Sequence, residues 1–432
     1  MIMIFASIVG HRPPRGNIAP RLMRCGSKGS ALLIALSLLP FAATVGSASE
    51  PPKSASIRRL DGTTITIAQA EAFARKTLEE AHVTGAQIAV IDRGRLVWSA
   101  AFGLRRIDPK LPIDDETNTW AASITKGVFS TYVMQLVEQR QLSLDTPVAQ
   151  QLPRPLNDYD AYRESATELV LDAAWPLVTP RMLLAHTSGL ANFAFIEPDK
   201  KMHLHFKPGT QYRYSGEGIN LVQFVIEQRQ GHRLDQLMQD ALFTPLGMTR
   251  TGMIYRTEFA ADVADRYGAD QQFISQTKRF PARAAGSMTA TADDLARFAA
   301  ALFSGKILKP ATRKAMLSPY IRVRSLHQFA IAANEPQGTE AAAVDLAYGV
   351  GWGLLLHTRF GPAFFKEGHG DGAQNYMICF VRPQACMIVL TNSDNGELTF
   401  QPLFETILGD TVTPWEWEGY TRSYIEASRQ HP

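Results

Sequence analysis

Cysteine is scarce in this 432-residue chain, which has only Cys25, Cys379 and Cys386. The last two flank Arg382-Pro383-Gln384-Ala385, which joins two apolar stretches. If Val381 paired with Cys386 across this hairpin, the two cysteines would lie diagonally on one face, further apart than a disulfide tolerates comfortably. We therefore expect buried free thiols, although an oxidising compartment would permit a bridge.

Long apolar runs are also lacking. The most apolar run, residues 31–45, is interrupted by Pro40 and is shorter than the roughly 20 residues of a membrane-spanning helix. Basic residues without any acidic residue precede this run, and Gly46-Ser47-Ala48 follows it, which is the pattern of a cleaved export signal. We expect residues 1–48 to be removed, with translation beginning at Met1 or at Met23.

This expectation makes residues 49–432 one exported domain, periplasmic or secreted. Because no cysteine stands at the cleavage point, we expect no lipid anchor and no stable membrane anchor after cleavage.

The mature chain has no excess of positive charge. The whole sequence has a formal net charge of +3, but its first 48 residues hold five basic residues and no acidic one. The remainder is slightly acidic, which gives no indication of nucleic-acid binding or of a membrane-surface role. Internal repeats and low-complexity segments are absent outside the leader. With 45% hydrophobic and 20% charged residues, the composition is that of a large globular enzyme.

The pattern Ser123-Ile124-Thr125-Lys126 begins a segment whose apolar residues recur at helical spacing. We expect an amphipathic helix that buries one stripe, with Ser123 and Lys126 on one face near its N-terminus. A serine needs a group that takes its proton, and a helix N-terminus favours developing negative charge. The alternative is that Ser123 only caps a buried helix.

A second copy of the pattern, Ser275-Gln276-Thr277-Lys278, lies in a polar stretch without a helical stripe. We interpret it as a solvated strand or loop. Such a short pattern recurs by chance, so the surrounding motifs decide between the two copies.

Further motifs follow Ser123 in a fixed order. A turn at Pro208-Gly209 leads to Tyr214-Ser215-Gly216 before another helical pattern, and Glu367-Gly368-His369-Gly370-Asp371-Gly372 precedes two apolar strands. His186-Thr187-Ser188-Gly189-Leu190 precedes the first of these motifs, and the glycine-rich stretch 348–353 lies between the two. From about Leu60 to about Gly409, this set resembles the serine β-lactamase and penicillin-recognising superfamily. The resemblance is to its class C-like branch, which includes D-alanyl-D-alanine carboxypeptidases, D-aminopeptidases and family VIII carboxylesterases.

The resemblance implies catalytic roles for Ser123, Lys126, Tyr214 and His369. Ser123 would attack a carbonyl and form an acyl-enzyme, while Lys126 and Tyr214 share the proton transfers. His369 would orient Tyr214 or a polar group of the substrate. The backbone N–H groups of Ser123 and Gly372 would form the oxyanion hole. The substrate-binding side would comprise Gly370, Asp371, Gly216 and Trp352, where Trp352 is a core residue or a pocket wall.

Two departures from the family pattern bear on the substrate. The Tyr-x-Asn motif ends in Gly216, which removes a side-chain amide, and His369-Gly370-Asp371 takes the place of Lys-Thr-Gly. Both argue against an efficient β-lactamase and favour an esterase, or a peptidase acting on D-amino-acid peptides. The alternatives are a non-catalytic penicillin-binding-like module and a true class C-type β-lactamase.

Periodicity predicts an α/β fold of the α+β type. We expect a helix over 66–81, a hairpin of 86–92 with 95–101, mainly helices over 123–304, strands at 352–359, 363–367, 374–381 and 386–391, and a last helix over about 400–408. One antiparallel sheet would then combine both chain ends (about 60–115 and 345–410), be flanked by helices and carry an inserted helical lobe (about 120–305). The resembling family has this layout.

We expect no cofactor and no metal. His203-Leu204-His205 lacks a nearby carboxylate or cysteine at ligand spacing, and the glycines of 348–353 lead into a strand, which excludes a dinucleotide-binding motif. The expected partner is a small-molecule or peptide-like substrate. The oligomeric state does not follow from the sequence.

Overall fold

A computed structural model describes residues 55–329 and 339–430. The expected export signal lies outside these residues. Within them, no helix combines the length and the apolar character needed to cross a membrane.

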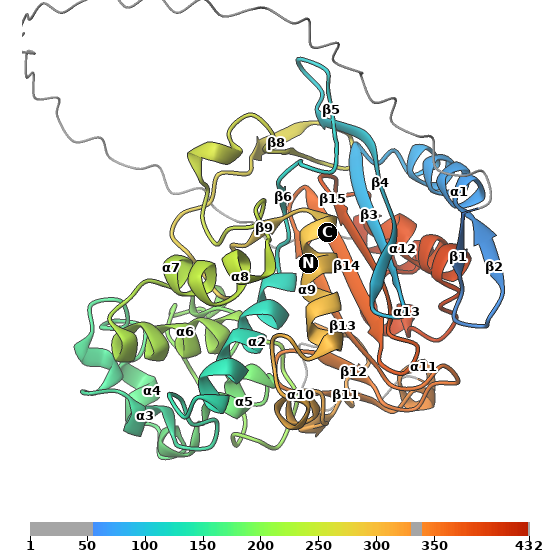
Figure 1. The fold of residues 1–432 in the computed structure, drawn as a ribbon. Coiled ribbons are helices and arrows are strands. Elements are labelled where there is room, and N and C mark those ends of the chain that lie inside the picture. Colours follow the sequence, from blue (N-terminus) through green and yellow to red (C-terminus); the bar gives the residue numbers. More distant parts are fainter. Residues whose placement is uncertain (1–54, 330–338, 431–432) are drawn as a thin grey trace, which may run out of the picture. The chain divides into compact units, whose positions relative to one another are not determined.

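The main feature of the described residues is a nine-stranded antiparallel sheet (Figure 1). In spatial order its strands are β10 (Ile321–Arg322), β11 (Leu346–Tyr348), β12 (Gly353–Leu355), β13 (Ala363–Gly370), β14 (Ala373–Phe380), β15 (Ala385–Thr391), β3 (Gly85–Asp92), β4 (Arg95–Arg106) and β5 (Leu111–Pro112). The C-terminal strand β15 pairs with the N-terminal strand β3, so both chain ends build one sheet. This confirms the predicted fold class.

Among residues 55–329 and 339–430, three two-stranded sheets lie outside the main sheet. They are β1 (Ser56–Arg58) with β2 (Thr64–Thr66), β6 (Thr119–Trp120) with β9 (Thr289–Ala290), and β7 (Asp265–Tyr267) with β8 (Phe273–Gln276). The last pair contains Ser275, which therefore lies on a strand as expected.

The helices form two groups around the sheet (Figure 1). The α-helices are α1 (Ile67–Glu80), α2 (Ile124–Glu138), α3 (Val148–Gln151), α4 (Thr167–Leu171), α5 (Pro180–Leu184), α6 (Gly216–Gln230), α7 (Leu234–Met238), α8 (Thr244–Leu246), α9 (Ala292–Ser304), α10 (Pro310–Met316), α11 (Thr339–Ala343), α12 (Glu397–Leu403), α13 (Trp415–Glu418) and α14 (Arg422–Gln430). Short 3₁₀ segments are η1 (Leu156–Asp158), η2 (Trp175–Leu177), η3 (Ala194–Ile196) and η5 (Thr257–Phe259), and π-helical segments are η4 (Gln239–Phe243) and η6 (Phe404–Leu408).

Alternate residues of the central strands belong to two separate cores. Cys379 and Ile388 face the core that contains α2 and α9, whereas Ile378 and Val389 face the core that contains α12 and η6. Successive side chains of a strand point to opposite faces, so a sheet covered on both faces needs strands that are apolar throughout. β14 and β15 are buried along their whole length, in agreement with this arrangement.

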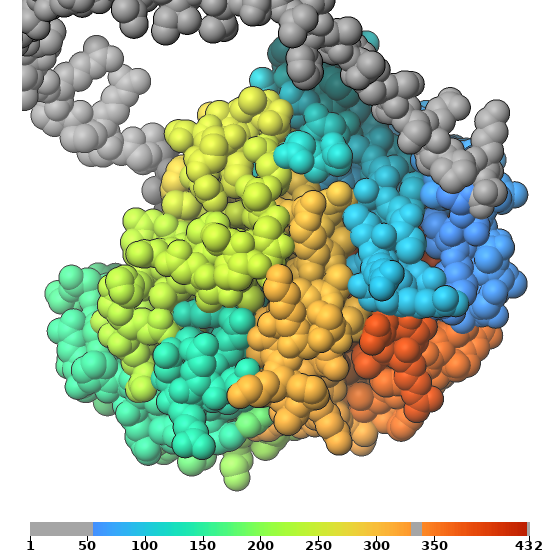
Figure 2. Space-filling view, viewed as in Figure 1, coloured from blue at the N-terminus to red at the C-terminus, as the bar shows by residue number. Residues whose placement is uncertain are grey.

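Residues far apart in the sequence meet around α9. Figure 2 shows residues near 300 lying between the N-terminal strands and the segments that follow α2. Helix α9 contacts β3, β4 and β15 of the sheet, and α2 contacts β13 and β14. Both helices therefore cover the same face of the sheet.

The local predictions at the N-terminal end are confirmed. Thr66 caps α1, and its side chain and that of Gln69 form the reciprocal capping box. The predicted hairpin is β3 and β4, turning at Arg93-Gly94.

Helix α2 differs from the prediction of a single buried stripe. Of its 15 residues, 12 are buried, and the exceptions lie near its C-terminal end. The sheet covers one side of α2 and the helical lobe covers the other, so a nearly all-round apolar surface is what this position requires.

The expectation of free thiols is wrong. Cys379, not Val381, lies directly opposite Cys386 across β14 and β15. The Cα atoms are 4.1 Å apart and a disulfide joins the two residues. The pairing register, which the sequence did not determine, decides this outcome.

Candidate active site

Ser123 and Lys126 meet at the N-terminus of α2. Ser123 is the N-cap residue, and Lys126 Nζ donates a hydrogen bond to Ser123 Oγ at 2.8 Å. The same amine donates to the backbone oxygen of Ala285. Lys126 is buried with 2% of its surface exposed, so its amine is held at the serine.

The surroundings of Lys126 favour its neutral form. Burial and the positive charge of Lys366 lower the pKa of Lys126 well below its usual value, against an opposing effect of Glu367. An amine can accept a proton only when it is neutral, so this shift suits a general base.

Tyr214 lies directly before α6 and reaches the same place from another part of the chain. Lys126 Nζ and Lys366 Nζ lie 4.9 and 4.8 Å from the centre of its ring, and Lys366 Nζ donates to Tyr214 Oη at 3.3 Å. Burial and the charge of Glu367 raise the pKa of Tyr214 well above its usual value, although its hydrogen bond with Ser123 lowers it. The phenol is therefore a proton donor at neutral pH.

Lys366 and Glu367 form an ion pair that is fully buried in β13. Burial lowers the pKa of Lys366, while the charge of Glu367 and the hydrogen bond to it oppose this shift. The pairing between β12 and β13 ends at Phe365, so Lys366 begins the stretch of β13 that has no strand on that side in the described residues. This edge faces Ser123.

His186 packs against the ring of Tyr214. Its ring stacks on the Tyr214 ring at 4.5 Å, and its Nδ1 accepts a hydrogen bond from the backbone N–H of Ser215. Burial and the charges of Lys366 and Lys126 lower the pKa of His186 well below its usual value. The imidazole is thus neutral and fixes the position of the tyrosine.

The structure corrects the expected contact between His369 and Tyr214. The His369 Nδ1 atom contacts Glu397 Oε1, and the group that contacts the Tyr214 hydroxyl is the amine of Lys366. Side chains alternate along β13, so His369 points to the face opposite that of Lys366. A role of His369 toward the substrate stays a prediction.

Electrostatics around His369 favour its charged form. Burial lowers the pKa of His369. The charge and hydrogen bond of Glu397, together with the charges of Asp394 and Asp371, outweigh burial and raise this pKa to about 9. The side chain is 51% exposed, so solvent screens part of this effect.

The expected oxyanion donors differ in their surroundings. No backbone or side-chain acceptor is recorded for the Ser123 N–H within residues 55–329 and 339–430, which leaves this group available. The N–H of Gly372 instead donates to Asp394 Oδ1 at 2.5 Å, in the turn after β13. The N–H of Gly372 is therefore already engaged, and its expected role as the second oxyanion donor stays a prediction.

The backbone before the nucleophile has an unusual conformation. Ala122 has a φ of +44°, a left-handed value that disfavours residues with a β-carbon. The Thr125 hydroxyl donates to the Ala122 carbonyl and holds this turn in place. The turn directs Ser123 onto the first turn of α2.

Gly370 and Asp371 lie beside Trp120 at the other end of the site. A β-carbon on Gly370 would stand 2.3 Å from the Trp120 ring, so only glycine allows this approach. The backbone oxygen of Asp371 accepts a hydrogen bond from Arg266. A role of Gly370 and Asp371 in substrate binding stays a prediction.

Two side chains crowd the position of the missing amide at Gly216, and the nearer one is the Phe193 ring, 2.5 Å from where a β-carbon would stand. The backbone N–H of Gly216 donates to Asn192 Oδ1 at 2.8 Å, and this oxygen lies 3.0 Å from where a Gly216 β-carbon would stand. Asn192 is a residue that the sequence interpretation missed, because nothing in the sequence links it to Tyr214.

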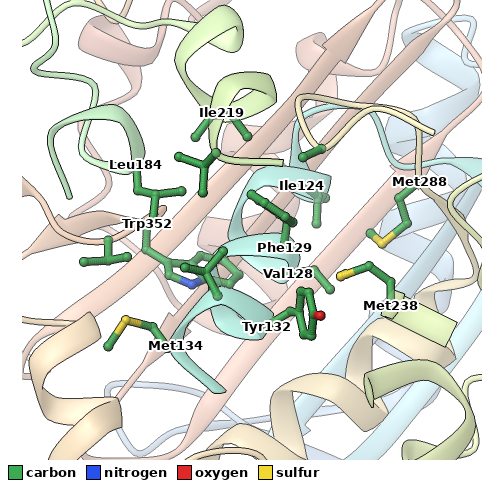
Figure 3. Packing of buried hydrophobic residues seen from close by; sticks show 14 of the residues in the cluster. Ile124, Val128, Phe129, Tyr132, Met134, Leu184, Ile219, Met238, Met288 and Trp352 are labelled. Carbon is green, nitrogen blue, oxygen red and sulfur yellow. The ribbon is translucent and has the colours of Figure 1, made fainter. Parts of the chain in front are cut away.

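Trp352 belongs to the core. It is fully buried, and its ring packs directly against Gly127 of α2, where a β-carbon would stand 2.6 Å from the indole. Figure 3 shows it inside the apolar cluster together with Phe129 and Leu184. Trp352 thus supports α2 and is not a substrate-binding residue.

His203 and His205 contact the carboxylates of Asp199 and Glu197 on the surface. Three or more potential metal-binding side chains are nowhere grouped together in the parts of the chain that the structure describes.

Comparison with known proteins agrees with this geometry. The family model described as Beta-lactamase matches residues 70–408. The chain belongs to the β-lactamase family. Penicillin-binding protein 4 of Amycolatopsis lactamdurans is 26% identical to this β-lactamase-family protein over 351 residues, covering 77% of this chain and 86% of the relative.

Two solved structures share the fold of this β-lactamase-family chain. A D-stereospecific amidohydrolase from Streptomyces sp. has a TM-score of 0.60 at 21% identity and covers 79% of this chain and 99% of its own. EstCE1, described as a hydrolase with promiscuous acyltransferase activity, has a TM-score of 0.61 at 20% identity and covers 77% of this chain and 95% of its own. The family and these neighbours make the chain a β-lactamase-fold serine hydrolase in general terms.

Lys366, Glu367 and His186 are further site residues that the sequence interpretation did not assign. One signal was available, because Lys366-Glu367 places two charges directly after the apolar residues 363–365 of a strand. Buried charges need a partner or a function. Lys366-Glu367-Gly368 also has the Lys-x-Gly form of the family motif, with glutamate at its centre.

Proposed function

We propose that this protein hydrolyses esters or D-amino-acid amides through an acyl-enzyme on Ser123. The observation that carries the proposal is the 2.8 Å contact between Lys126 Nζ and Ser123 Oγ, made by an amine whose pKa is lowered. Two groups whose pKa values are moved in opposite directions suggest a base and an acid, here Lys126 and Tyr214.

In the first half-reaction, neutral Lys126 takes the proton of Ser123 Oγ while this oxygen bonds to the substrate carbonyl carbon. The carbonyl electron pair moves to its oxygen, which the Ser123 N–H and a second donor from β13 stabilise, each by about 3–4 kcal/mol. When the tetrahedral intermediate collapses, the bond to the leaving group breaks. Tyr214 gives its proton to the leaving group and regains one from the protonated Lys126.

In the second half-reaction, water replaces the alcohol or amine that has left. Lys126 takes a proton from this water, and the resulting hydroxide attacks the acyl carbon. Collapse releases the acid and returns a proton to Ser123 Oγ. Lys366, hydrogen-bonded to Tyr214, keeps the phenol in position for both steps.

Lactams are the less favoured substrates in this proposal. On β13, Lys366 is fully buried and paired with Glu367, and the exposed His369 is paired with Glu397, so neither cation is free for a lactam carboxylate. Gly216 supplies no side-chain amide, and Asn192 offers its amide from another direction. The amidohydrolase and EstCE1 neighbours support amides and esters as alternatives.

The test compares kcat/KM for a p-nitrophenyl butyrate ester with that for nitrocefin, together with intact-mass analysis after a fluorophosphonate. We expect one adduct per chain and faster ester hydrolysis. Nitrocefin hydrolysis equal to or faster than ester hydrolysis would identify a β-lactamase instead. The absence of both an adduct and turnover would favour a binding module that keeps the fold.

The proposal includes export of the mature chain. Two observations support it: residues 1–48 have the sequence pattern of a cleaved leader, and a disulfide such as Cys379–Cys386 is typical of oxidising compartments. Protein purified from its native host should begin close to Ser49. An intact N-terminus in a cytosolic fraction would contradict this proposal.

A further inference from the structure

A group of arginines lies on Trp120, three residues before the nucleophile. The guanidinium carbons of Arg279 and Arg266 are 3.9 and 4.9 Å from the centre of the Trp120 ring. The Trp120 Nε1 donates to Gly286 O, and Lys126 Nζ donates to the adjacent Ala285 O. The indole is therefore anchored directly beside the catalytic lysine.

Arg279 has no carboxylate partner. Over residues 55–329 and 339–430, its guanidinium makes no ion pair and donates no hydrogen bond, and the ring of Trp120 is its contact. Burial and the positive charges of Arg266 and Arg283 lower the pKa of Arg279 to about 10. The negative charge of Asp371 acts in the opposite direction. An unpaired, partly buried guanidinium among positive charges attracts an anion.

Arg266 fixes the geometry of this group. It donates to the backbone oxygen of Asp371 and to the hydroxyl of Ser275, the serine of the second Ser-x-x-Lys pattern. Its Nε is buried and has no hydrogen-bond partner among the described residues. The negative groups nearby are Asp371 and Asp394, which raise the pKa of Arg266 against the larger effect of burial. The charge of Asp371 therefore acts on both arginines that lie on Trp120.

Along β13, the arginines lie at the Trp120 end of the site, whereas Tyr214 lies at the Lys366 end. Residues 120–123 run beside β13: Gly370 approaches Trp120, Gly368 approaches the carbonyl of Ala121, and Lys366 reaches Tyr214. Gly370 and Lys366 are four residues apart, about 13 Å along a strand. Tyr214 protonates the leaving group, so the leaving group lies at the Lys366 end and the acyl chain extends toward Trp120.

We propose that Arg279, stacked on Trp120 and flanked by Arg266, binds a carboxylate on the acyl chain of the substrate. The substrate class is then a monoester or monoamide of a dicarboxylic acid. This proposal rests on the hydrolase function proposed above, because its kinetic test requires that the protein hydrolyses esters. It goes beyond that function because it assigns the charge of the acyl group.

The test uses p-nitrophenyl monoesters of succinate, glutarate and adipate, with p-nitrophenyl valerate as the uncharged comparison. We expect at least one monoester to be preferred by the parent protein. Arg279→Gln should lower the ratio of kcat/KM for that monoester to kcat/KM for valerate about tenfold, since it removes a charge-assisted contact. Arg279→Lys should recover part of the ratio.

Arg154→Gln is the matched control, because Arg154 also stacks on an aromatic ring, 4.1 Å from the centre of Tyr159, in the helical lobe. This control should leave the ratio as in the parent protein. An unchanged ratio in Arg279→Gln, or a parent protein that prefers valerate over all three monoesters, would overturn the subsite.

A binding measurement separates this inference from the hydrolase proposal. Glutarate can be titrated calorimetrically into Ser123→Ala and into Ser123→Ala/Arg279→Gln, since neither measurement needs turnover. A tenfold weaker Kd in the double variant supports the subsite even if no ester is hydrolysed. Equal affinities, or no binding to Ser123→Ala, would exclude it.

Discussion

Lys366 donates a hydrogen bond to the hydroxyl of Tyr214 at 3.3 Å, although 152 residues separate them in the chain. This contact brings strand β13 to the start of helix α6, and both to the serine at the start of α2. It also explains why the chain can lack a lysine at position 369. The amine comes from three residues earlier, where alternation along the strand turns it toward Tyr214.

Replacing the nucleophile should abolish the chemistry. Ser123→Ala removes the only hydroxyl that contacts Lys126 Nζ in the described residues, so hydrolysis and fluorophosphonate labelling should both disappear while the fold is retained. Intact mass and circular dichroism measure these outcomes. Ser275→Ala, in the second copy of the pattern, should still form the adduct. Labelling that persists in Ser123→Ala would refute the assignment.

Replacing Tyr214 should reveal its role as a proton donor. Tyr214→Phe should lower kcat/KM about 100-fold for an ethyl ester, whose alkoxide needs a proton, and much less for a p-nitrophenyl ester. Hydrolysis assays on both esters give the comparison. Equal losses would show that Tyr214 acts before the leaving group departs. Tyr320→Phe, at a half-exposed tyrosine outside the site, is the control.

Removing the charge of Lys366 should shift the pH profile. The positive charge of Lys366 is one cause of the lowered pKa of Lys126, so Lys366→Met should raise that pKa. Only neutral Lys126 is active, and the acid limb of kcat/KM should therefore move to higher pH, by about one unit. Lys201→Met, which removes an exposed lysine paired with Glu168, should leave the limb in place.

The same variant should be less stable, since Glu367 would remain buried without its ion-pair partner. We expect a loss of about 3 kcal/mol in the free energy of unfolding. Lys366→Met/Glu367→Leu should recover much of it in urea titrations. An acid limb that stays fixed in folded Lys366→Met would show that Lys366 does not tune the base.

The pair His369–Glu397 should make stability depend on pH. In the folded protein the pKa of His369 is about 9, above the usual 6.5 of an unfolded histidine. The folded state thus binds the proton more tightly. The stabilisation is complete below about pH 6.5 and is lost as the pH rises through about 9.

Urea titrations at intervals from pH 6 to pH 10 measure this loss, and an NMR titration of the imidazole measures the pKa itself. Glu397→Gln should flatten the dependence and bring the pKa of His369 back toward 6.5. A His369 that titrates near 6.5 in the parent protein would contradict the prediction.

Removing the disulfide should destabilise the sheet without affecting the chemistry. Cys379→Ala/Cys386→Ala opens a short covalent loop, and we expect the free energy of unfolding to fall by about 2 kcal/mol. Labelling of Ser123 should persist, because both cysteines lie in the core. Two free thiols detected in the unfolded, unreduced parent protein would show that the bridge does not form.

The sequence predicted the parts of this molecule that depend on local periodicity. The capped helix after Thr66, the hairpin at Gly94 and the position of Ser123 and Lys126 at a helix start follow from spacing alone. A family resemblance placed Tyr214 beside them. Local patterns and motif order were sufficient for these features.

Features that depend on register could not be predicted in this way. The pairing of Cys379 with Cys386 depends on a two-residue shift of the hairpin register, and the face on which His369 lies depends on the start of β13. A slip by one residue reverses every side chain of a strand. Lys366, Asn192 and Arg279 become neighbours of the site only through tertiary contacts, which no local pattern contains.

Ala122 also affects how this enzyme could be improved. Its left-handed backbone opposes folding by about 1–2 kcal/mol, and Ala122→Gly would relieve that strain. Glycine would also allow the turn before Ser123 to sample other conformations, so the orientation of the Ser123 side chain would no longer be fixed. If variants are selected for thermostability alone, we therefore expect substitutions at position 122 that make the protein more stable and its hydrolysis slower. Activity has to be selected together with thermostability if the residue is to persist.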